Sequence, residues 1–176
     1  MAVTPANPES DALLTQALEL AEQQARLRAI SEQLAPRDTL VAAFGSEAAF
    51  RRQLLDALMT RVRGEMLAAV EGLDAGNTRV LGGLNAYLDA QLKRPVIREL
   101  MQVLKEVDGG TDYIRGRIAG FNYLIAAELK SISWPHPELT ARLLAASVIE
   151  AATIEFECGK RLEDMRGIFA DYLHTR

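Results

Sequence analysis

The stretch that decides the fold is LRAISEQLAPRDTLVAAFGSEAAF, residues 27–50. Apolar residues recur at helical spacing on both sides of Ala35-Pro36, where the proline interrupts the pattern. Gly45-Ser46 then ends the second segment and caps a third, because glycine suits a helix C-terminus and serine a helix N-terminus. The stretch therefore predicts helical segments over 27–34 and 39–44, followed by a long helix.

Upstream, the sequence predicts one more helix behind a short tail. Residues 1–9 contain two prolines and are predicted to be a disordered tail. Ser10 is suited to cap a helix over residues 11–24. The segment 27–34 can continue that helix or form a separate short one. The apolar positions of helix 11–24 are Leu13, Leu14, Ala17, Leu18 and Ala21.

Downstream, three further helices follow from the apolar spacing. Four-residue steps from Phe50 to Met66 predict a long helix over 46–73. Apolar positions from Val80 to Leu92 predict a second helix, which must end before Pro95. A third begins at Pro95, which suits a first helical turn, and stops at Gly109-Gly110.

The last third of the chain is the most apolar. Residues 118–127 and 143–149 contain no charged side chain, which predicts helices buried on several sides. A turn at 134–137 separates them, and Cys158-Gly159-Lys160 separates a helix over 138–158 from a final one over 160–173. Because alanine and leucine supply 52 of the 176 residues, we expect an all-α fold of about nine helices.

Composition excludes several classes of protein. The single Cys158 cannot form an internal disulfide or a cysteine-based metal cage, so a zinc finger is excluded. No window reaches about 18 uncharged apolar residues, and the N-terminus lacks the basic and apolar pattern of a signal peptide. The sequence therefore predicts a soluble cytoplasmic protein that does not contact a membrane.

The order of the segments resembles the TetR-type (TetR/AcrR) repressor family. The resemblance lies in ALEL at 17–20, LRAISEQ at 27–33 and RDTLVAAFGSEAAF at 37–50, which stand in the family's order ahead of a long helix. It implies a helix-turn-helix head over 10–46 and a helical ligand-binding and dimerisation domain over 47–176. It also implies a homodimeric, ligand-responsive transcriptional regulator. Its DNA-contact candidates are Arg26, Arg28, Arg37, Thr39 and Arg51.

Several residues of this head depart from the family pattern. Asp38, Val41 and Ala43 stand where Gly, Tyr and His or Tyr are usual, and Glu47 replaces a Lys that touches phosphate. Residues 1–50 carry seven acids and three bases, which accounts for the whole net charge of -4. Phosphate neutralisation supplies much of the affinity for DNA.

Three readings of the function therefore stay open. One is a regulator with a divergent but working head. Another is a helical dimer that has lost DNA binding and acts as a small-molecule-binding or protein-interaction module. The third is an all-helical bundle unrelated to repressors.

The resemblance further implies a small, mostly apolar effector bound among the C-terminal helices. Methionine, aromatic and a few polar side chains suit an adaptable cavity of this kind. Asn122 lies in an uncharged run and needs a partner, because buried polar groups are nearly always hydrogen-bonded. The pocket candidates are Met59, Val62, Met66, Tyr87, Met101, Leu104, Phe121, Asn122 and Tyr123.

The last two helices are apolar on more faces than one contact inside the chain covers, which predicts a two-fold dimer interface. The interface and core candidates are Leu139, Leu143, Ala146, Ile149, Ala152, Phe156, Phe169 and Leu173.

Side chains with catalytic or metal-binding chemistry are few. His136 and His174 each stand without a second His, Cys or carboxylate pair at metal-ligand spacing. Glu155 and Glu157 flank Phe156 and are predicted to form a solvated rim. We expect no enzymatic activity, no metal and no cofactor.

Overall fold

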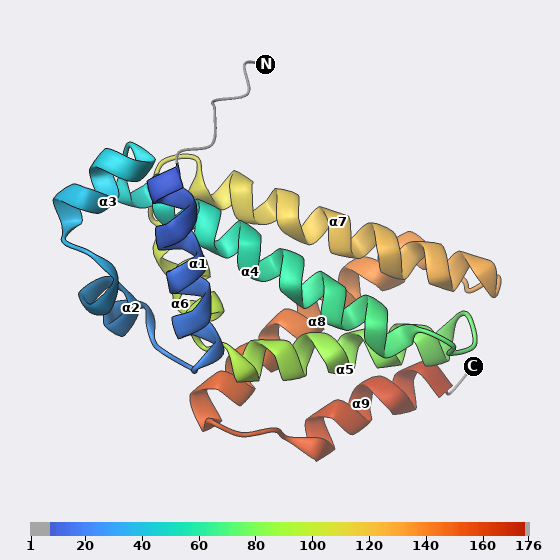
Figure 1. Ribbon diagram of the computed structural model, residues 1–176. Coiled ribbons are helices and arrows are strands. Elements are labelled where there is room, and N and C mark those ends of the chain that lie inside the picture. Colours follow the sequence, from blue (N-terminus) through green and yellow to red (C-terminus); the bar gives the residue numbers. More distant parts are fainter. Residues whose placement is uncertain (1–7, 175–176) are drawn as a thin grey trace. The chain divides into compact units, whose positions relative to one another are not determined.

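The computed structural model of the chain describes residues 8–174 (Figure 1). This part of the chain consists of helices and connecting turns without a strand, which confirms the predicted all-α class. In chain order the helices are α1 (Pro8–Glu22), α2 (Leu27–Leu34), α3 (Arg37–Phe44), α4 (Glu47–Val70), α5 (Asn77–Lys93), α6 (Val96–Lys105), α7 (Gly110–Ser131), α8 (Pro137–Cys158) and α9 (Glu163–His174).

The first two helices differ from the sequence prediction at their starts. α1 begins at Pro8, so Ser10 lies inside the helix and the prediction that it caps the helix was wrong. A proline fits there because the first N–H groups of a helix have no partner within it. α2 is a separate helix, since Gln24 has a positive φ of 62° and Arg26 is extended. Residues 1–7 of the predicted tail lie outside the described residues.

The turn between α3 and α4 forms as predicted. Gly45 takes a φ of 79° and donates its N–H to the carbonyl of Val41 at 2.8 Å, which ends α3. Ser46 Oγ accepts the N–H of Ala49 at 3.0 Å and so caps α4. The rings of Phe44 and Phe50 pack across the turn with centroids 5.1 Å apart.

The chain divides into two compact units. Among the described residues, the first comprises 8–60 and 93–110, and the second comprises 61–92 and 111–174. The first unit therefore includes α6 and the first half of α4 beside α1, α2 and α3. The predicted functional domains, 10–46 and 47–176, remain predictions. Buried apolar residues of the first unit include Ala17, Ala21, Leu27, Ile30, Leu34, Leu40, Phe44, Phe50, Leu54, Leu58, Leu100 and Leu104.

Carboxylates hold α6 and α1 in place within the first unit. Glu99 of α6 accepts the backbone N–H of Leu27 at 2.6 Å and Nη1 of Arg26 at 3.0 Å. Leu27 is the first residue of α2, so Glu99 satisfies one of the N–H groups that a helix start leaves unpaired. Glu22 of α1 accepts Nε of the buried Arg94 at 2.6 Å.

Two contacts in the second unit show that α5 and α7 run antiparallel. Glu128, near the end of α7, accepts the N–H of Gly76 just before α5 at 3.1 Å. Eleven residues further along the chain, the ring of Tyr87 packs on Phe121 of α7 at 5.3 Å between centroids. The two helices therefore run in opposite directions and meet at these two points.

The uncharged segments of α7 and α8 are each buried on one side only within this chain. In α7, Ile125 and Ala126 are buried while Leu124 is exposed, and in α8 Leu144 is buried while Leu143 is exposed. The prediction of burial on several sides is therefore wrong for the single chain. Large apolar residues exposed on α7, α8 and α9, or directly after α7, are Tyr123, Leu124, Ile132, Leu139, Leu143, Ile154, Ile168 and Tyr172.

Candidate functional sites

α2 and α3 are two short helices that follow each other closely in the first unit. Only Ala35 and Pro36 connect them, both with extended backbone. The side chains of Leu40 and Phe44 on α3 are buried in the core, whereas Val41 is 40% exposed. The accessible face of α3 therefore combines charged groups at its start with small apolar side chains: Arg37, Asp38, Val41 and Ala42.

Every arginine predicted to contact DNA forms an ion pair with a carboxylate. Arg26 pairs with Glu99 at 3.0 Å and Arg28 with Glu32 at 2.8 Å. The fifth candidate, Thr39, is half-buried. Both remaining arginines meet one acid, Glu47 in the first turn of α4, which pairs with Arg37 at 3.6 Å and also with Arg51.

Three of these four ion pairs are weak enough to exchange. Arg26, Arg28 and Arg37 all have more than half of their side-chain surface exposed. Exposed pairs of this kind contribute about 0–1 kcal/mol, because water screens them. An arginine can therefore leave its carboxylate for a phosphate at small cost. Glu47 is the acid that pairs with two of the candidates.

The structure separates the nine predicted pocket residues between the two units. Met59, Met101 and Leu104 belong to the first unit and the other six to the second. In the second unit Val62 and Tyr87 are buried, and Met66, Phe121 and Asn122 are half-buried. Tyr123 is 75% exposed and faces solvent, so it does not line an enclosed cavity of this chain.

Besides Asn77, whose Oδ1 is unpaired but whose Nδ2 donates to the carbonyl of Leu173, two amide side chains in the second unit have buried polar atoms without a hydrogen-bond partner. One is Asn122, whose Oδ1 is unpaired. The other is Gln91 of α5, whose Oε1 and Nε2 are both unpaired and which is 1% exposed. Sequence reasoning missed Gln91. Its position three residues after Leu88 and four after Tyr87, on the buried face of α5, was the available signal.

A groove of about 540 Å³ lies elsewhere in the second unit, where α4 ends and α5 begins. Two of its charged side chains contact each other, since Arg79 lies 3.2 Å from Glu128, and Arg79 also donates to the carbonyl of Leu73 at 2.8 Å. None of the predicted pocket residues lines it. The lining residues are Leu67, Ala68, Val70, Glu71, Gly72, Arg79 and Glu128.

The predicted dimer residues divide into surface and core. Leu139, Leu143 and Ala146 are exposed on α8 and are available for an interface. Ile149 and Phe156 are half-buried. Ala152, Phe169 and Leu173 are buried within the chain and belong to its core. Ile168 and Tyr172 of α9, which the sequence did not single out, are exposed.

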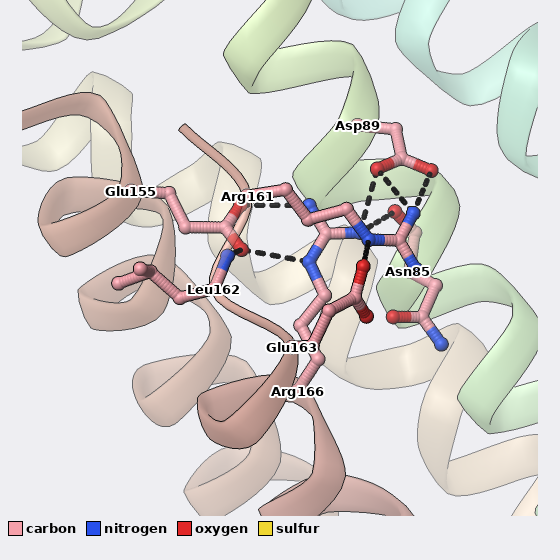
Figure 2. Close-up of polar contacts among 7 residues, drawn as sticks. All are labelled: Asn85, Asp89, Glu155, Arg161, Leu162, Glu163 and Arg166. Atoms are coloured by element: carbon pink, nitrogen blue, oxygen red, sulfur yellow. Dashed lines mark hydrogen bonds and ion pairs between the residues drawn. The ribbon is translucent and has the colours of Figure 1, made fainter. Parts of the chain in front are cut away.

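Glu155 belongs to a buried ion cluster, so the prediction that it forms a solvated rim was wrong. Figure 2 shows its carboxylate facing Arg166, and both residues are buried. Burial by itself raises the pKa of Glu155, but hydrogen bonds from Arg166 and from the N–H of Leu162 outweigh it and hold that pKa below its ordinary value. Arg166 also binds Asp89 of α5 at 2.6 Å. The cluster therefore joins α5, α8 and α9.

Other chemistry in residues 8–174 is sparse. His136 and Cys158 are exposed, and His174 lies 2.7 Å from the carbonyl of Ala170. Within this range no three His, Cys, Asp or Glu side chains gather closely enough to hold a metal ion. Nor does any helix there combine the length and hydropathy needed to cross a membrane.

The comparisons with known proteins concern the fold. No protein-family model and no curated protein matches the sequence. Among solved structures, the chain is similar to the Clostridium perfringens "putative fatty acid metabolism regulator", with a TM-score of 0.66 and 15% sequence identity. The match covers 92% of this chain and 96% of that chain. The two proteins thus share an all-helical architecture over nearly their whole lengths.

Proposed function

We propose that this chain is a homodimeric, ligand-responsive transcriptional regulator of the TetR type, with α2 and α3 as a divergent DNA-reading head. The observation that carries the proposal is the fold shared with the Clostridium perfringens protein, which is named a regulator. The sequence resemblance over residues 17–50 supports the same class independently. Such a protein acts in the cytoplasm, and we propose no catalytic activity for it.

The head supports DNA binding through its basic groups. The exposed start of α3 brings Arg37 to the surface, and Arg28 of α2 is also exposed. Their carboxylate partners are surface groups, so each arginine exchanges its partner for a phosphate with little loss of stability. Phosphate contacts of this kind position a head on DNA, while base contacts from α3 give specificity.

The second unit supports the homodimer. Leu139 and Leu143 of α8 and Ile168 and Tyr172 of α9 expose apolar surface at four-residue spacing. That spacing places each pair on one helical face. A two-fold interface formed by these helices would cover the apolar surface and bring two heads onto one DNA molecule.

Selection of fragments from genomic DNA tests the head. We expect the purified chain to enrich a palindromic site, with an affinity that falls steeply as salt rises. Arg37→Ala should weaken binding and reduce the salt slope by about 1. Arg63→Ala, which removes an exposed arginine of α4 in the second unit, is the matched control. Absence of any retained fragment at low salt would refute the proposed DNA binding.

A second candidate function is a helical dimer that has lost DNA binding and acts on a ligand or protein partner. It is favoured by the pairing of all four candidate arginines with carboxylates. The same selection discriminates the two functions. This candidate predicts no retention at low salt, even for Glu47→Gln, in which two arginines lose their competing acid.

A further inference from the structure

Gln91 is exceptional among the buried polar residues described in the second unit. Thr140 accepts Nε1–H of Trp134 at 3.2 Å, and Glu155 pairs with Arg166. Gln91 is as deeply buried as Glu155, yet neither its Oε1 nor its Nε2 has a partner. The folded chain thus contains an amide whose hydrogen-bonding capacity is unused.

An unused buried amide is unfavourable for the folded state. Its water contacts are lost and no protein contact replaces them, whereas nearly all buried polar groups in proteins are paired. A methionine of the same length would fill the position without that cost. Gln91 is therefore better explained by a partner from outside the chain than by packing.

The surroundings of Gln91 indicate what this partner is. Tyr87, one helical turn earlier on the same buried face, packs its ring on Phe121 of α7. Beside Phe121, Asn122 has an unpaired buried Oδ1. Phe121 and Asn122 are half-buried, whereas Tyr87 and Gln91 are buried. Tyr87 and Phe121 thus offer aromatic surface one helical turn from the unpaired amide of Gln91, and Phe121 is partly accessible to solvent.

The head group of the partner follows from charge and hydrogen bonding. A buried ionic head needs an opposite charge that is still available. Glu155 and Arg166 already neutralise each other. Arg94, three residues after Gln91, pairs with Glu22, and the buried Arg98 is engaged as well. A carboxamide offers a donor and an acceptor side by side, so its complement offers an acceptor and a donor.

We propose that Gln91 anchors a small neutral ligand that carries a donor beside an acceptor, as a primary amide does, with a hydrocarbon body packed on Tyr87 and Phe121. The inference deepens the proposed function and rests on it, because it names the effector class of the regulator.

Stability without ligand gives the first test. Gln91→Met should raise the Tm of the full chain by about 2–4 °C, because it removes an unpaired buried amide. Gln53→Met, at an exposed position of α4, is the matched control and should leave the Tm within about 1 °C. A lower Tm for Gln91→Met would mean that the amide is paired in solution, and would overturn the inference.

Ligand binding gives the second test. Calorimetric titration of the full chain with octanamide, octanoate and octylamine compares one hydrocarbon body with three head groups. We expect saturable binding of octanamide alone, weakened at least about tenfold in Gln91→Met. No binding of octanamide, equal binding by the variant, or equal binding of octanoate would each overturn the inference.

The two proposals fail separately. DNA enrichment without octanamide binding would support the proposed regulator and refute the proposed class of effector. Octanamide binding without DNA enrichment would support Gln91 as the anchor of the ligand. The chain would then be the ligand-binding helical dimer of the second candidate function.

Discussion

Glu155 at the end of α8 and Arg166 in α9 form a two-pronged ion pair, with Nε to Oε1 and Nη2 to Oε2 each at 2.7 Å (Figure 2). Both side chains are almost fully buried. A planar guanidinium that meets a carboxylate in this way fixes direction as well as distance. The pair therefore sets where α9 begins relative to α8, the two helices that carry the proposed dimer surface.

Removal of one member of this pair should destabilise the chain strongly. Arg166→Met leaves the Glu155 carboxylate buried without its partner and should lower the free energy of unfolding by about 3–5 kcal/mol. Chemical denaturation of the purified variants measures this loss of free energy. Arg161→Met is the matched control, because exposed Arg161 binds the same Asp89 and its loss should cost less than about 1 kcal/mol.

A double variant checks the mechanism of that loss. When Glu155→Met is added to Arg166→Met, no uncompensated charge is left, so the double variant should be more stable than the single Arg166→Met chain. Equal loss in the double and single variants would mean that the pair acts through packing and not through charge.

Acid should lower the stability of the folded chain by protonating Glu155. Its pKa is lower in the folded chain than in the unfolded chain, where glutamate titrates near pH ~4.3. The folded state therefore gains stability above that pH and loses it as the pH falls toward the folded pKa. We expect the Tm of the wild type to fall more steeply between about pH 5 and pH 3 than that of Glu155→Gln.

The exposed Glu157 provides the control for this titration. Glu157→Gln removes a carboxylate two residues away on α8 and should keep the steep decline of the wild type. Equal slopes for Glu155→Gln and the wild type would contradict the role of the buried pair.

The same pair shows what sequence patterns can and cannot predict. Helix ends follow from local chemistry, so proline and glycine signals placed α3, α4, α5 and α8 within a few residues. The burial of Glu155 depends on Arg166, eleven residues later and beyond a loop, and no helical period connects the two. Gln91 was missed for a related reason, since its spacing indicates burial but not whether its amide is paired.

The sequence also does not distinguish apolar residues of the surface from those of the core. Spacing assigns Leu143 and Leu144 alike to an apolar helix, yet Leu144 is buried and Leu143 is 65% exposed. A sequence does not distinguish a face covered by its own chain from one covered by another copy. For this reason the predicted dimer set mixed exposed Leu139 with buried Leu173.

Leu143→Asp should separate the proposed dimer. Each of the two symmetric copies would bring a charge into an apolar contact and lose about 1.5–3 kcal/mol, so the dissociation constant should rise by about two to four decades. Sedimentation at several protein concentrations measures this dissociation constant. Leu67→Asp, on an exposed leucine of α4, is the matched control. A soluble Leu143→Asp dimer with unchanged affinity would exclude this interface.

Glu47→Gln should strengthen DNA binding if the head works as proposed. Glu47 pairs with both Arg37 and Arg51, so its neutralisation frees two guanidinium groups of the first unit. Each phosphate that they gain adds about 0.9 to the salt slope. We expect tighter binding at low salt, a slope steeper by up to about 2, and a stability loss of about 0.3–1 kcal/mol from the first turn of α4.

Asp74→Asn separates this local effect from net charge. Asp74 is exposed in the second unit, and its replacement changes the charge of the chain by the same amount. Binding measured across a salt series should change little for this variant. If Glu47→Gln and Asp74→Asn instead behave alike, Arg37 and Arg51 do not reach phosphate. The head would then bind DNA, if at all, through Arg26 and Arg28.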